Sequence, residues 1–142
     1  MAIKTNLQKH NAIDTSKEES GVWHDFAGDV KLRIRRLSSK ISQNARKDAE
    51  KPYAAQLRLK EVPAEVYDSI LVQQLARGVI ADWEGVTDED GKDIPYSGDV
   101  AAEVIAGPEM KDFRLEVLNL SMDKDSYRAE VTEAAVEKPI CG

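Results

Sequence analysis

The first residues of this sequence that could bind a ligand are the carboxylate residues clustered in one short segment. Residues 88–93 read Asp-Glu-Asp-Gly-Lys-Asp. An EF-hand calcium loop needs oxygen ligands at fixed positions around its invariant glycine, and a bidentate Glu at its last position. If Gly91 stands for that glycine, Val86 falls at the first ligand position and Ser97 at the last. Neither residue fits its position, so the segment predicts a solvated acidic turn and no metal site.

The histidines and the cysteine are too few to make another site. His10 lies in a polar N-terminal segment, His24 lies in a predicted strand where we expect it on the outer face, and Cys141 precedes the last residue. Zinc usually takes four ligands in closely spaced pairs, and a nucleophilic cysteine must be held beside a base. The glycines form no phosphate-binding loop. The sequence therefore predicts a protein that is not an enzyme and has no catalytic residue, metal or cofactor.

The composition is that of one soluble domain. Of 142 residues, 42% are hydrophobic and 32% are charged, which suits a globular protein. No run approaches the roughly 18 apolar residues of a membrane span, and the first residues lack the apolar block of a signal peptide. A single cysteine can form no internal disulfide, so a reducing cytoplasm is the expected location.

Charge is unevenly distributed along the chain. Residues 31–60 hold ten Lys or Arg against two acidic residues, whereas residues 82–142 hold sixteen acidic residues against six basic ones. A basic segment can bind nucleic acid, but Tyr53 is its single aromatic residue for stacking on bases. Because the chain carries its own acidic counter-charge, we expect pairing within the molecule or self-association, and no nucleic acid or membrane partner.

The elements that position these residues begin with a polar stretch, residues 1–20, which we expect to be a flexible arm until a partner orders it. Residues 21–37 predict a β-hairpin, because apolar and charged residues alternate from Val30 to Arg35 after a small Ala-Gly-Asp link. The remainder, to residue 142, predicts helices. The expected fold class is mainly α: a single small domain of about four helices with an N-terminal β-hairpin.

The best predicted helix runs from Ala64 to Trp83 and is apolar on two sides. One broad face contains Trp83, and Val66, Ile70 and Ile80 lie roughly opposite it. A helix of this kind is central in a domain or binds a second surface. The opposite strip is a candidate partner-binding site, with the alternative that the hairpin covers it within the same domain.

Further helices are predicted around this one. The first spans residues 39–50 and is ended by Pro52. Another is capped by Ser97 and stopped by Gly107-Pro108, and the next one carries Phe113 and Val117 on one side. A final helix is predicted over roughly residues 124–137.

The sequence around the end of the central helix resembles the signature of small tail assembly chaperones of long-tailed, siphophage-type phages. In that family an apolar helix ends in Asp-Trp-Glu-Gly, an acidic Asp-Gly turn follows, and Pro-Tyr-Ser opens the next helix. The similarity covers roughly residues 64–120. The residues that carry it here are Trp83, Glu84, Gly85, Asp90, Gly91, Pro95 and Tyr96, and we expect their role to be mainly structural.

The resemblance implies a function. Such chaperones bind the long tape measure protein, keep it soluble, help recruit tail tube protein, and act in the host cytoplasm during virion assembly. The alternative is a small structural tail or head–tail connector protein that stays in the virion.

Overall fold

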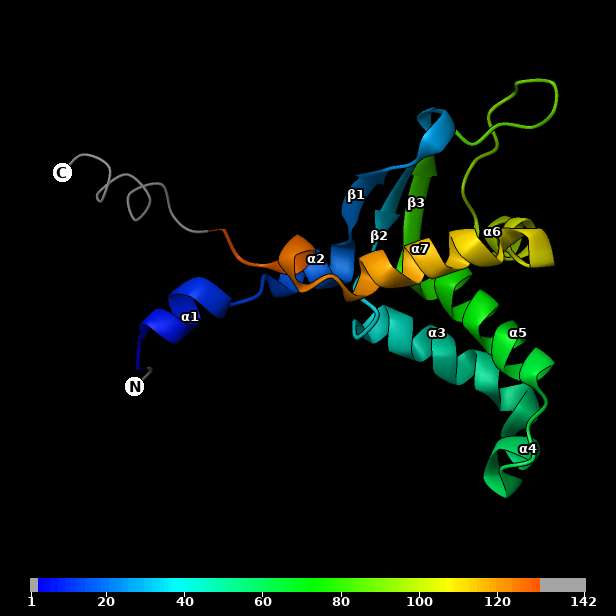
Figure 1. Cartoon of the computed structure of the whole chain (residues 1–142), viewed down its shortest axis with the longest axis horizontal. Helices are drawn as coiled ribbons and strands as arrows, with labels where there is room; N and C mark the ends of the chain where they lie inside the picture. The colour runs from blue at the N-terminus through cyan, green and yellow to red at the C-terminus, as the bar shows by residue number, and fades with distance from the viewer. Residues whose placement is uncertain (1–2, 131–142) are drawn as a thin grey trace.

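A three-stranded antiparallel sheet organises the domain in the computed structural model, which describes residues 3–130 (Figure 1). The strands are β1 (Val22–Asp25), β2 (Lys31–Ile34) and β3 (Ile80–Glu84), in the order β1-β2-β3. The helices are α1 (Asn6–Asn11), α2 (Thr15–Ser20), α3 (Lys40–Glu50), α4 (Ala54–Leu59), α5 (Ala64–Gln74), α6 (Gly98–Ile105) and α7 (Lys111–Met122). None of the helices in these described residues is long and apolar enough to cross a membrane.

The predicted hairpin is confirmed as strands β1 and β2. His24 pairs with Leu32, and Val22 pairs with Ile34. Leu32 and Ile34 are buried, and residues directly opposite each other in a sheet share a face. His24 therefore lies on the inner face of the sheet, and the expectation that it points outward was wrong.

The central helix predicted over Ala64–Trp83 is the main correction. The α-helix ends at Gln74, a π-helical turn follows over Leu75–Val79, and Ile80–Glu84 form β3. Strand β3 pairs with β2, so that Trp83 lies opposite Leu32 and Ile80 opposite Ile34. A half-buried strand such as β2 gains backbone hydrogen bonds from a second neighbour, and this long-range pairing outweighs local helix propensity.

A β-bulge explains why the sequence pattern looked helical at this point. Asp82 pairs with Arg33 and Ile80 with Ile34, which leaves Ala81 as the extra residue. A bulge shifts the alternation of side chains by one. Ile80 and Trp83 therefore both face the core, although they are three residues apart, which is the spacing expected on one face of a helix.

The predicted fold class was therefore wrong. The chain forms a mixed α/β domain, in which a three-stranded sheet replaces the lone N-terminal hairpin and the third strand comes from the middle of the chain. The apolar core lies between the inner face of the sheet, the π-helical turn, α6 and α7. Its members include Trp83, which is 7% exposed as expected, and Val117.

Helices α6 and α7 follow their predicted signals closely. The Ser97 hydroxyl accepts a hydrogen bond from the Val100 N–H at 3.1 Å and caps α6. Pro108 begins a 3-10 turn that leads into α7. Phe113 on α7 packs against Phe26 beyond β1, with ring centroids 5.4 Å apart. These contacts hold α7 across the inner side of the sheet.

Helices α3, α4 and α5 form a projection that points away from the sheet (Figure 1). Ser39 caps α3 by accepting a hydrogen bond from the Ser42 N–H at 3.2 Å. Helix α3 ends before Pro52, as predicted, and α4 turns the chain back into α5. Lys60 ends α4 in the left-handed conformation, with φ of 59°.

The two ends of the described chain meet beside β1. The Asp14 N–H donates to the Tyr127 carbonyl at 2.8 Å, and the Ala129 N–H donates to the Ala12 carbonyl at 2.9 Å. Arg36 pairs with Glu18 of α2 at 2.9 Å. Helix α2 is thus bound to the domain, although neither α1 nor α2 has a buried residue.

The last predicted helix, residues 124–137, lies partly beyond the described structure. Lys124–Tyr127 form a 3-10 turn. Residues 131–142, which include Cys141, lie outside the described residues.

Candidate protein-binding groove

The acidic turn at residues 88–93 is held by its own hydrogen bonds. The Asp88 carboxylate accepts from the Asp90 N–H at 2.9 Å and from the Lys92 N–H at 3.0 Å, and Gly91 takes a positive φ of 81°. Within residues 3–130, no group of three or more His, Cys, Asp or Glu side chains could hold a metal ion. These contacts give Asp88 a structural role in the turn.

The motif residues around Trp83 connect the sheet to the turn that follows it. The Trp83 indole N–H donates to the Ile94 carbonyl at 2.7 Å. The Tyr96 ring lies edge-on to Trp83, with centroids 5.3 Å apart. A side chain at Gly85, whose φ is 79°, would meet the Asp29 carbonyl. Glu84 and Pro95 are exposed.

Tyr96 also serves the π-helical turn. Its hydroxyl lies 2.6 Å from the Ala76 carbonyl and 2.8 Å from the Ile80 carbonyl. The Arg35 guanidinium donates to the Gly78 carbonyl at 3.0 Å. The change from helix to strand leaves carbonyls without helical partners, and these two side chains satisfy them. Burial raises the pKa of the Tyr96 hydroxyl above its ordinary value, so it remains protonated and able to donate at neutral pH.

The predicted partner strip is not assembled as one surface. Ile80 is fully buried in β3, Ile70 is 5% exposed on α5, and Val66 is half-buried near the start of α5. Helix α3 packs along α5. A partner could therefore not contact these three side chains together while the domain stays folded.

A groove of about 570 Å³ lies between α3 and α5. One wall is the α3 side, where Ile41, Ala45 and Ala49 recur every four residues and Tyr53 continues the row. The opposite wall holds polar residues of α5 and the π-helical turn with the same spacing. These are Ser69, Gln73 and Arg77.

Beside the groove, α3 and the π-helical turn lie in direct contact. A Cβ atom added at Gly78 would lie 2.7 Å from the Ser42 Cα, so only glycine permits this approach. The Gln74 amide donates to the Ser42 hydroxyl at 3.0 Å, and both residues are buried. A buried polar pair with satisfied hydrogen bonds fixes the orientation of the two elements.

The groove has the features of a site for a helix. Its α3 wall presents small or apolar side chains at one-turn intervals, and Ile41 is 41% exposed. Amphipathic helices bind in grooves through anchors spaced in this way. Two charged residues line the hollow, Asp48 and Arg77. Asp48 pairs with Lys51 at 3.1 Å and Arg77 pairs with Asp99 at 2.7 Å, so the rim carries charges of both signs.

The sequence predicted a helix over residues 39–50 but did not indicate this wall. The signal was present as the spacing of four between Ile41, Ala45 and Ala49. Alanines contribute little to an apolar pattern. These alanines form the wall of a groove only because α5 lies beside α3.

Comparison with known proteins gives one family. The model of the YdaY prophage protein family matches residues 37–138, which is more than half of the chain. The chain belongs to the YdaY prophage protein family. No curated protein and no solved structure matches it. Phage origin, expected from the sequence, is thereby confirmed.

The family match contains the whole groove. It begins at Leu37, after β2, and continues through α3, α5, β3 and the motif around Trp83. The β1–β2 hairpin lies outside the matched range. The part of this YdaY-family protein that the family shares is therefore the helical projection together with β3, α6 and α7.

Proposed function

We propose that this YdaY-family protein is a phage tail assembly chaperone that binds helical segments of the tape measure protein in the groove between α3 and α5. Membership of a prophage protein family supports a role in phage biology. The motif from Asp82 to Ser97, which resembles that of tail assembly chaperones, supports a role in tail assembly. The observation that carries the proposal is the groove itself, whose α3 wall repeats small and apolar side chains at helical spacing.

The same groove suggests how such a chaperone acts. Tape measure proteins are long and largely helical, so their apolar stripes need cover before the tail tube forms. The groove covers one such stripe without enclosing it, and its charged rim keeps the complex hydrated. Release then needs no chemical step. In this proposal the protein is not an enzyme, has no cofactor, works in the host cytoplasm and hands the covered segment over as tail tube protein assembles.

Co-expression with the tape measure protein of the same phage tests the proposal. Ala49→Glu places a charge in the α3 wall, and we expect it to lower the soluble fraction of the tape measure protein several-fold. Ala55→Glu is the matched control, because Ala55 is exposed on α4 and does not line the groove. Ser69→Glu repeats the test from the opposite wall, in case the first variant loses stability. Full solubilisation by both groove variants would refute the docking site.

Analysis of purified virions by mass spectrometry separates the chaperone from its alternative. A chaperone is expected to be absent from the finished particle. A structural tail or head–tail connector protein is present in stoichiometric copies, and that result would overturn the proposed function.

A further inference from the structure

The two edges of the sheet differ in how their backbone groups are covered. Strand β3 forms one edge, and side chains bond to its outward groups. The Asp82 carboxylate accepts from the Trp83 N–H at 2.8 Å, and the Tyr96 hydroxyl lies 2.8 Å from the Ile80 carbonyl. The bulge at Ala81 also interrupts this edge. Side-chain cover and bulges keep an edge strand from pairing with another chain, so the β3 edge is closed.

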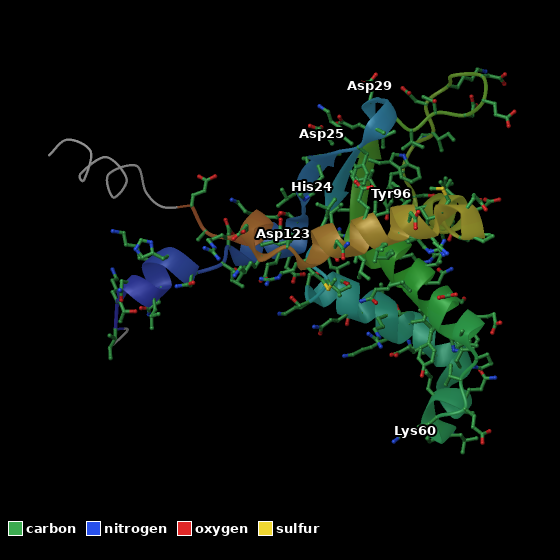
Figure 2. All side chains as sticks on the ribbon, in the orientation of Figure 1. His24, Asp25, Asp29, Lys60, Tyr96 and Asp123 are labelled. Atoms are coloured by element: carbon green, nitrogen blue, oxygen red, sulfur yellow. The ribbon has the colours of Figure 1, made fainter. Side chains whose placement is uncertain are left out.

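The edge at β1 has no such cover. The Phe26 N–H donates to the Val30 carbonyl at 2.7 Å, and hydrogen-bonded pairs alternate along an antiparallel ladder. The N–H and C=O groups of Trp23 and Asp25 therefore point away from β2. Within residues 3–130, these groups make no hydrogen bond, β1 has no bulge, and it pairs with β2 alone. The segments that meet beside the start of β1 pair with each other. Figure 2 shows Asp25 on this outermost strand, whose open edge is a template for a further strand.

Two opposite charges beside the β1 edge also lack partners in the described chain. Trp23 and Asp25 alternate with the inward-facing His24, so they lie on the outer face of the sheet, where both are exposed. The Arg33 guanidinium lies over the Trp23 ring, 5.8 Å from its centroid. Among residues 3–130, neither Arg33 nor Asp25 makes an ion pair. A complementary strand therefore places a carboxylate opposite Trp23, next to this guanidinium.

Strand β1 of a second molecule meets this requirement. If a two-fold axis passes beside His24, the two copies of β1 run antiparallel and Trp23 of each lies opposite Asp25 of the other. Each such pair exchanges two backbone hydrogen bonds. The Asp25 carboxylate then lies beside the Trp23 ring and the Arg33 guanidinium of the other copy. Shifting one strand by two residues sets Asp25 against its own copy, which repels, and the reverse shift pairs it with Gly21, whose φ is 94°.

We propose that this protein forms a two-fold dimer through antiparallel pairing of its β1 strands, which joins two three-stranded sheets into one continuous sheet. A two-fold contact uses the same surface on both molecules and closes, so assembly stops at the dimer. Strand β1 has four residues, and an interface of this size is weak, so we expect dimerisation between about 10 µM and 1 mM. The dimer does not depend on what binds in the groove between α3 and α5.

Sedimentation velocity of the full chain at neutral pH over that concentration range tests the proposal. The wild type should shift from monomer to dimer and form nothing larger. Asp25→Lys places a positive charge beside Arg33 of the other copy and should weaken dimerisation at least about 10-fold. Glu84→Lys is the matched control, because Asp25 and Glu84 are both exposed and both lie opposite Lys31. Glu84 belongs to the closed edge, so this variant should dimerise like the wild type.

Two further variants test the backbone pairing itself. Proline has no N–H, and the N–H of residue 25 points outward, so Asp25→Pro keeps the bonds of the hairpin and should give a folded monomer. His24→Cys, with Cys141 replaced by alanine, gives an independent test if the proline variant unfolds. Its two thiols flank the axis, where Cα atoms lie about 4.5 Å apart, and should oxidise to a disulfide-linked dimer. Trp23→Cys in the same background should not cross-link, because its two copies are offset along the strands.

Several outcomes would overturn the proposal. One is a wild type that stays monomeric at about 1 mM. Others are dimerisation that survives in Asp25→Lys or in folded Asp25→Pro, and an equal loss in Glu84→Lys. Cross-linking of Trp23→Cys in place of His24→Cys would likewise contradict the paired strands.

Discussion

Replacing Tyr96 with phenylalanine tests how the chain changes from helix to strand. The substitution removes one hydroxyl and leaves the ring in place. The contact with the Trp83 ring, whose centroid is 5.3 Å away, is therefore retained. The hydroxyl has one proton and lies within hydrogen-bond distance of two carbonyls, those of Ala76 and Ile80. Both residues are fully buried. Leaving a buried acceptor unsatisfied costs about 1–3 kcal/mol. We therefore expect Tyr96→Phe to lower the free energy of unfolding by that amount and the melting temperature by roughly 3–10 °C.

Urea unfolding followed by far-ultraviolet circular dichroism measures this loss. The slope with urea should not change, because the folded and unfolded surfaces are the same. Tyr67→Phe on α5 is the control. Tyr67 is 53% exposed, so this variant should lose less than about 0.5 kcal/mol of unfolding free energy. If Tyr96→Phe also costs less than about 0.5 kcal/mol, the tyrosine is not what satisfies the π-helical turn, and our account of the transition is refuted.

Three further predictions concern the same core. Gly78→Ala should destabilise the protein by about 1–2 kcal/mol in urea unfolding, because the added Cβ meets α3 backbone and this outweighs the helix propensity of alanine. Trp83→Ala should cost about 3–5 kcal/mol in the same assay, and a loss under about 1 kcal/mol would contradict its place in the core. Burial lowers the pKa of His24, although Asp123 and Asp25 act to raise it. The unfolded chain therefore takes up a proton first as pH falls through about 6.5, and the unfolding free energy should drop there. His24→Gln should remove that part of the pH dependence, whereas His10→Gln, in the exposed α1, should leave it in place.

The local parts of this fold could be read from the sequence. Strict alternation from Val30 to Arg35 gave the β1–β2 hairpin, and Ser97 marked the start of α6. The acidic turn at residues 88–93 was also expected to be solvated, and its residues are exposed. Each of these depends on residues that are neighbours in the chain.

The parts that the sequence did not reveal depend on distant partners. Strand β3 exists because β2 offers it an edge, and Tyr96 and Arg35 satisfy the backbone at the transition. The bulge at Ala81 then gave a strand the residue spacing of a helix. His24 was placed on the wrong face because nothing local shows that its strand pairs it with Leu32. The groove depends on how α3 packs along α5, and the sequence of α3 alone does not indicate that packing.

The pairing between the two ends of the described chain has a consequence for synthesis. Tyr127 is fully buried, and its hydroxyl donates to the Ile34 carbonyl at 2.8 Å across a sequence separation of 93 residues. Asp14 and Ala12 bond to the same late segment. During translation, strands β1 and β2 leave the ribosome long before Tyr127 does. The N-terminal segment and one side of the sheet therefore stay incompletely covered until the segment that contains Tyr127 has been synthesised.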